Sequence, residues 1–200
     1  ILITKKFILD TLACAIAGSS APGCGSVVEV VKDWGGKKES TIMLYGGKVI
    51  ATHAALVNSM MIQALEIDDI HEEAVLHANV TVLPAALAMA ERKGNVSGEE
   101  LIGAVAIGVD LVGRLGLGIV SRHLDWVITT VTGYFGAAVA AGKILGMRED
   151  MLRNAMGIAL TQTAGSLQTV ADKVLVKRML AGFAARGGVL AAVLAQKGIT

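Results

Sequence analysis

Residues 54–93 read AALVNSMMIQALEIDDIHEEAVLHANVTVLPAALAMAERK, and this stretch predicts two helices joined by a polar loop. Apolar side chains recur every three or four positions in its first part, which predicts a helix. Charged and polar residues then take over from Glu66 to Asn79, which predicts a polar loop. A second helix should follow, capped by Thr81, with Pro84 in its first turn and Gly94 at its end. The expected apolar face of the first helix comprises Leu56, Val57, Met60, Met61, Ala64 and Leu65.

The helical period continues on both sides of this stretch. Upstream, one helix should end at Gly18, and a second, capped by Ser26, should end at Gly35. The first of these should bury Phe7, Ile8, Leu12, Ala15 and Ile16. Further helices are expected over residues 97–118, 134–145, 150–163 and 178–196. Weak alternation over residues 41–52, around Gly46-Gly47, predicts one hairpin.

These elements indicate an all-α, multi-helix domain with at most one short hairpin. Strands do not alternate with helices, so the pattern argues against a parallel α/β sheet. We expect a single helical domain over residues 1–200. The start at Ile1, and the end at Thr200 directly after a helical pattern, favour a fragment of a longer protein.

Composition narrows the class of protein. Hydrophobic residues make up 54% of the chain and charged residues 18%, which argues against disorder. Each long apolar run contains a charge, such as Asp110, Lys143 or Arg186, so no membrane span is expected. A net charge of +1 without a basic, aromatic-rich tract gives no support for nucleic-acid binding. Two cysteines are too few for a disulfide framework, which favours a cytoplasmic protein.

The polar loop from Glu66 to Asn79 is the first candidate for chemistry. Asp68 and Asp69 sit at the end of an apolar helix, where carboxylates can act as bases, and His77 can exchange protons near neutral pH. A solvated acidic loop that caps a neighbouring backbone is the alternative. Metal binding is disfavoured, because His71 and His77 lack the spacing that aligns two ligands on one helix face.

A second candidate is the cationic stretch Asp172–Arg178, where a loop meets the start of a helix. Lys177 and Arg178 there suggest an anionic partner, since a helix N-terminus with a cation attracts carboxylates. A solvated pair of cations is the alternative.

The order and spacing of several short motifs resemble the MmgE/PrpD family, which includes 2-methylcitrate dehydratase and cis-aconitate decarboxylase. The matching pieces are residues 9–12, 17–18, 54–58, 64–69, 82–88, 133–138, 143–146, 177–182 and 191–195. The resemblance covers nearly the whole chain. It implies the larger, helical domain of a two-domain dimeric enzyme, with the family's smaller α/β lid domain absent from this chain.

The resemblance also implies a site and a chemistry. The family's site lies between its two domains and uses no metal and no cofactor. Carried onto this chain, it makes His77, Asp68, Asp69 and Lys177 catalytic, with Glu66 and Arg178 binding a small polycarboxylate. This sequence departs from the family's pattern at Gln63 and Val127, where the family often has histidines, at Ile70, where it often has threonine, and at Glu66, where it usually has aspartate.

Three functions are compatible with these residues. The first is a hydro-lyase that removes water from a 2-methylcitrate-like acid. The second is a related decarboxylase, isomerase or epimerase. The third is a non-catalytic helical oligomerisation module, a reading that the replacements Ile70 and Val127 favour. The expected partners are a small polycarboxylate and a second copy of the chain, with no nucleic acid and no membrane.

Overall fold

The computed structural model describes residues 1–119 and 125–200. These ranges hold nine α-helices, one short 3₁₀ helix and one two-stranded hairpin, so the all-α prediction is confirmed. The elements are α1 (Leu2–Gly18), α2 (Cys24–Trp34), β1 (Ser40–Thr41), β2 (Lys48–Val49), α3 (Ala51–Gln63), α4 (Asn79–Lys93), α5 (Gly98–Ile119), α6 (Ile128–Ile144), α7 (Glu149–Gln162), α8 (Gln168–Ala171), η1 (Leu175–Met179) and α9 (Leu180–Gln196).

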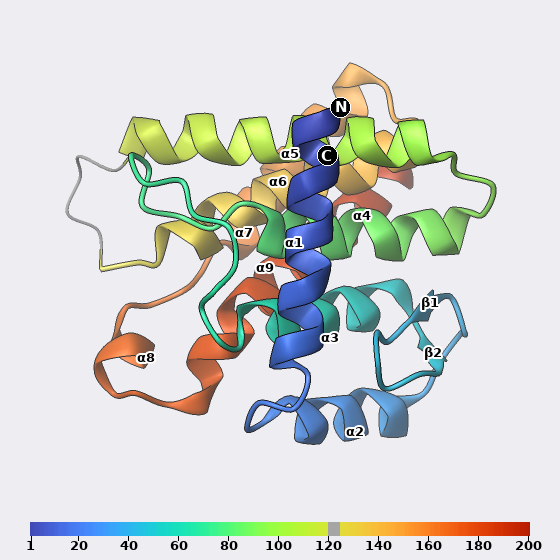
Figure 1. The fold of residues 1–200 in the computed structure, drawn as a ribbon. Coiled ribbons are helices and arrows are strands. Elements are labelled where there is room, and N and C mark those ends of the chain that lie inside the picture. Colours follow the sequence, from blue (N-terminus) through green and yellow to red (C-terminus); the bar gives the residue numbers. More distant parts are fainter. Residues whose placement is uncertain (120–124) are drawn as a thin grey trace.

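Helices α6 and α9 form the centre of the molecule. Helix α6 packs against α9, α5, α4 and α7, and α9 packs in turn against α3. Figure 1 shows α5 lying across the top, α1 running down the front, α2 at the bottom and the hairpin at the lower right. The loop from α3 to α4 and the segment from α7 through α8 lie on the same side of this body (Figure 1). That side holds the candidate site.

Helix α3 is buried on every side rather than along one stripe. All residues of α3 except Thr52 are buried. It contacts α1, α4 and α9, and a helix enclosed by neighbours needs no polar face. The predicted face is correct from Leu56 to Ala64, but Leu65 lies beyond the helix and is 45% exposed.

Helix α1 ends at Gly18 as predicted, and its buried face was predicted in part: Ala15 is buried and Ile8 and Leu12 pack half-buried against the core, but Phe7 and Ile16 are exposed. Its buried residues are Thr11, Cys14, Ala15 and Gly18. A Cβ at Gly18 would clash with the carbonyl oxygen of Met61, so α1 and α3 approach backbone to backbone. Small side chains permit this approach, and Ile16 is left 61% exposed on the outer face.

The predicted N-caps of two helices are also wrong. Helix α4 begins at Asn79 rather than after Thr81, which puts Pro84 beyond the first turn. Helix α2 begins at Cys24 after Gly23, which has a φ of 92°, so Ser26 lies inside the helix.

Other local signals are confirmed. Glu100 N–H donates to the Ser97 hydroxyl, and Ser97 N–H donates to the Glu100 carboxylate, which is the predicted capping box of α5. Strands β1 and β2 pair antiparallel, and both Gly46 and Gly47 in their turn have positive φ.

Two helices within the described ranges are long and apolar enough to cross a membrane, judged by length and composition alone. They span Gly98–Ile119 and Leu175–Gln196, with mean hydropathies of 1.7 and 1.5. Most of the second is buried inside the protein, and a core helix passes the same test. The expectation of no membrane span therefore stays a prediction.

Candidate functional site

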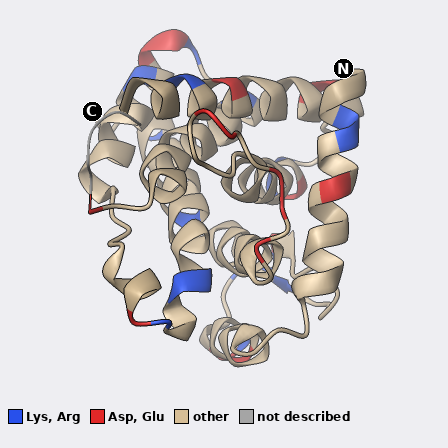
Figure 2. Ribbon diagram, turned by 60° about the vertical axis from the view of Figure 1, so that its left-hand side comes forward, with Lys and Arg blue, Asp and Glu red and all other residues tan. Residues whose placement is uncertain are grey.

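The loop between α3 and α4 carries His77 to the surface of α6. His71 and Leu76 pair as an antiparallel bridge, which closes the loop on itself just before His77. The backbone N–H of His77 then donates to the Thr129 hydroxyl, 3.0 Å away, at the start of α6. Figure 2 shows acidic positions following one another along this loop. Two backbone anchors therefore fix the histidine at the edge of the helical body.

The side chain of His77 is held by Asp68. Its Nδ1 lies 3.3 Å from Oδ2 of Asp68, and the two side chains are 19% and 0% exposed. The Asp68 carboxylate raises the pKa of His77 above its ordinary value, against the opposing effect of burial. Because Nδ1 faces Asp68, Nε2 is the nitrogen left to exchange a proton with a ligand.

Asp69 has a different place from Asp68. Its Oδ2 accepts hydrogen bonds from the backbone N–H and the side-chain amide of Asn79, at 3.4 and 3.3 Å. Burial raises the pKa of Asp69. Asp69 thus satisfies the first backbone N–H of α4, the capping role that was predicted for Thr81.

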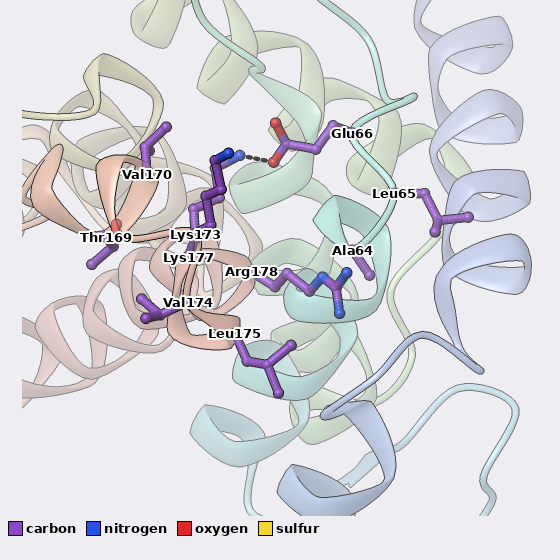
Figure 3. A pocket seen from close by; sticks show the side chains of 10 residues that line it. All are labelled: Ala64, Leu65, Glu66, Thr169, Val170, Lys173, Val174, Leu175, Lys177 and Arg178. Carbon is purple, nitrogen blue, oxygen red and sulfur yellow. Dashed lines mark ion pairs between the residues drawn. The ribbon is translucent and has the colours of Figure 1, made fainter.

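Lys177 comes to the same region from η1, the short helix before α9. Its ammonium forms an ion pair with the Glu66 carboxylate, drawn as a dashed line in Figure 3. Burial, and secondarily the charge of Arg178, lower the pKa of Lys177. Arg178 points away from Glu66 in Figure 3, and its Nη1 donates to the carbonyl oxygen of Pro22, 2.7 Å away.

Two neighbouring cavities meet at the Glu66–Lys177 pair. The first, of about 400 Å³, carries the cations and is lined by Ala64, Leu65, Glu66, Thr169, Val170, Lys173, Val174, Leu175, Lys177 and Arg178 (Figure 3). The second, of about 340 Å³, carries the imidazole and is lined by Gln63, Glu66, Val75, His77, Trp126, Val127, Ile128, Thr129, Leu167, Val170 and Lys177. Glu66, Val170 and Lys177 belong to both.

The structure thus brings most of the predicted site residues together. His77, Glu66 and Lys177 line one cavity, Asp68 lies behind His77, and Arg178 lines the adjoining cavity. Asp69 does not contribute to the described lining of either cavity. The chemical roles of these predicted site residues stay predictions.

Sequence reasoning missed Thr129 and Trp126. Thr129 anchors the backbone of His77, and Trp126 lines the cavity beside it. Both lie 49 or more positions beyond His77 in the chain, by subtraction of residue numbers, and no local pattern links them to it.

Metal binding finds no geometric support in the described part of the chain. There, no three His, Cys, Asp or Glu side chains gather closely enough to hold a metal ion. The two histidines of the loop have separate partners: Nδ1 of His71 accepts a hydrogen bond from the Ala74 N–H, while His77 faces Asp68. That the protein uses no metal remains a prediction.

The fold and the cavities define a helical domain that gathers an acid, an imidazole and an ammonium at one edge. The chain belongs to the MmgE/PrpD family, because the MmgE/PrpD N-terminal domain matches residues 1–200. Over 97% of its length it is 37% identical to cis-aconitate decarboxylase of Aspergillus terreus, of which the match covers 41%.

Two further relatives show the same pattern. The chain is 34% identical to the cis-aconitate decarboxylase-like protein oryM of Aspergillus oryzae, with 97% of the chain and 42% of the relative covered. It is 31% identical to human cis-aconitate decarboxylase, with 98% and 42% covered. The chain therefore spans about two fifths of the length of these relatives.

Proposed function

We propose that this chain forms the helical part of a lyase that acts on small polycarboxylic acids by general acid–base catalysis. One observation carries the proposal: the His77 imidazole, backed by the buried Asp68, lines the same cavity as the Lys177 ammonium. Family membership and the names of the relatives support it.

The cationic side chains of the site bind the carboxylates of the substrate. A polycarboxylate brings several negative charges, and Lys173, Lys177 and Arg178 line the cavity that adjoins the imidazole. Lys177 stands at the junction, so it can contact a carboxylate beside the reacting carbon. Such a fixed positive charge stabilises negative charge that grows in the transition state.

Decarboxylation of a cis-aconitate-like acid is the first candidate reaction. The bond to a carboxylate one carbon away from a double bond breaks, and CO₂ leaves. The electron pair of the broken bond forms a new double bond to the neighbouring carbon of the old double bond. The π electrons of the old double bond move to its far carbon, which takes up a proton. His77 is the proton donor, since the Asp68 carboxylate raises the pKa of the imidazole and so favours its protonated form.

Dehydration of a 2-methylcitrate-like acid is the second candidate. Here a base removes a proton next to a carboxylate, and His77 protonates the departing hydroxyl so that water leaves. The observation that favours dehydration is the Glu66–Lys177 pair, which lines the same cavity as His77. The Glu66 carboxylate of this pair can serve as the base.

Product analysis tests the proposal. The full-length protein is given cis-aconitate or 2-methylcitrate in D₂O, and the products are followed by proton NMR with CO₂ measured in parallel. Release of CO₂ with one deuterium incorporated supports decarboxylation, and an alkene formed without CO₂ supports dehydration. If neither acid reacts and calorimetry detects no binding of either, the proposal fails and a non-catalytic helical module takes its place.

A further inference from the structure

Asp69 and Asn79 connect the polar loop to the first turn of α4, and the two side chains bury more acceptors than donors. The backbone N–H and the side-chain amide of Asn79 both donate to Oδ2 of Asp69, at 3.4 and 3.3 Å. Oδ1 of Asp69 and Oδ1 of Asn79 are buried, and neither accepts a hydrogen bond from any described residue. Buried acceptors without a donor are rare in folded proteins, because each has lost its hydrogen bonds to water. One additional proton would supply the missing donor.

The additional proton belongs on Asp69 rather than on its neighbour Asp68. Asp68 faces the imidazole of His77, which becomes a cation when it is protonated and can then balance a carboxylate charge. The groups that donate to Asp69 are both uncharged, and both belong to Asn79. Of two neighbouring buried acids, the one without a cationic partner keeps its proton more readily.

The environment of Asp69 favours the protonated acid. Burial raises the pKa of Asp69 above its ordinary value of 3.8, and the charge of Asp68 raises it further, while hydrogen bonds to the carboxylate lower it. The imidazole of His77, the nearest cationic group of the loop, is turned to Asp68. The charge of Asp69 would therefore be buried beside a like charge.

The groups that face this region from α1 and α5 are acids and a thiol. Cys14 of α1 is close enough to Asp10 and to both acids of the loop for their charges to act on its thiol. Burial is the main cause that raises the pKa of this thiol to about 11, so the thiol is uncharged at pH 7. On α5, Asp110 lines a small cavity that Asn79 also lines, and Arg114 is paired with Asp110.

We propose that Asp69 carries a proton in the folded protein at pH 7 and donates it from Oδ1 to Oδ1 of Asn79. The two side chains then form a closed pair, in which each group donates one hydrogen bond and accepts one. Because this pair is uncharged, Asp68 is the acid of the two whose charge acts on His77. Asp69 is thus a positioning residue at the start of α4, and its proton is one that the proposed reaction does not use.

The titration of His77 in the full-length protein tests this assignment of charge. An ionised Asp69 would raise the pKa of His77, whereas a protonated Asp69 would not. Asp69→Asn should therefore leave the pKa of His77 unchanged, measured by proton NMR of the imidazole ring. Asp68→Asn is the matched control and should lower that pKa. A fall in the pKa of His77 in Asp69→Asn would overturn the inference.

Urea denaturation of the same protein gives a second test. A group whose pKa is raised by folding loses its contribution to stability as pH rises toward the folded pKa. The wild type should therefore lose stability relative to Asp69→Asn between pH 5 and pH 7. Asparagine keeps both hydrogen bonds of the closed pair, since its amide offers one donor and one acceptor. No change between the two pH values, or a relative gain by the wild type, would contradict the inference.

The wild type itself decides the question if Asp69→Asn does not fold. In protein labelled with ¹³C at the aspartate carboxyl carbons, one buried carboxyl group should stay protonated at pH 7. Its NMR signal should remain in Asp68→Asn. The inference is wrong if every aspartate is ionised at pH 7, or if Asp68→Asn removes the signal.

These measurements do not depend on turnover, so the inference and the proposed function can fail separately. If neither cis-aconitate nor 2-methylcitrate reacts or binds while Asp69 is protonated, the lyase is excluded and the closed pair remains. If an acid turns over while Asp69 is ionised, the closed pair is excluded and the lyase remains.

Discussion

Nδ1 of His77 lies 3.3 Å from Oδ2 of Asp68, and the Asp68 side chain has no exposed surface. A buried carboxylate next to an imidazole favours the protonated ring. It also sets which nitrogen of the ring is available to a ligand. Protonation of His77 should therefore stabilise the loop between α3 and α4 as well as supply the proton for the proposed reaction.

The pH dependence of stability should reveal this pair. The pKa of His77 is raised in the folded state above its ordinary value of 6.5, so the pair stabilises fully below about pH 6.5. The contribution is lost as pH rises through the folded pKa. The difference in unfolding free energy between wild type and Asp68→Asn should be larger at pH 6 than at pH 9, measured by urea denaturation. A difference that grows with pH would contradict the assignment.

Replacing His77 should impair catalysis far more than folding. Positioned acid–base groups contribute about 10²–10⁴-fold to rate, so His77→Gln in the full-length enzyme should lower kcat by that order. His71→Gln is the control, because His71 lies in the same loop but lines neither cavity. Steady-state kinetics and thermal melts of both variants make the comparison. Similar kcat values for the two variants would remove His77 from the reaction.

Lys177 should matter more than Lys173 for binding. Losing a hydrogen bond to a charged group weakens binding by about 10- to 100-fold, so Lys177→Met should raise KM for a polycarboxylate by that order. Lys173→Met should have a smaller effect, since Lys173 does not line the cavity that holds His77. Equal increases in KM would show that the two cations act only through their overall charge.

Two glycines of α5 should respond in opposite ways to alanine. A Cβ at Gly108 would lie 2.7 Å from Val82 and 3.0 Å from the carbonyl oxygen of Gly136, so Gly108→Ala should cost about 1–3 kcal/mol. Gly103 has no neighbour within 4 Å of such a Cβ, so Gly103→Ala should stabilise the helix by about 0.5–1 kcal/mol. Urea denaturation measures both. Equal stabilities would mean that α5 does not approach α6 as closely as described.

Local signals in the sequence predicted much of the fold. The capping box at Ser97, the glycine turn of the hairpin and the end of α4 before Gly94 each depend on residues close together in the chain. They could be predicted because the backbone hydrogen bonds that they satisfy are local. The start of α4 could not, because its first N–H is satisfied by Asp69, ten positions earlier.

Part of the candidate site was predictable too. The resemblance pointed to His77 and Lys177, and the structure places both on one cavity. Asp68 and Asp69 are chemically identical neighbours, so the residues alone could not say which one faces the imidazole. The path of the loop decides that, because it turns Asp68 to His77 and Asp69 to Asn79.

By itself, the sequence determined that this chain is helical, where most of its helices end, and which loop carries the acids and the imidazole. The spacing of apolar residues and the hydrogen bonds at helix ends depend on residues that are close together in the chain. Contacts made only in the folded chain select the small-residue face of α1 for burial and bring Trp126 and Leu167 to the cavity beside His77. Both features depend on contacts between segments that are far apart in the chain. Close packing of their backbones determines which segments lie side by side.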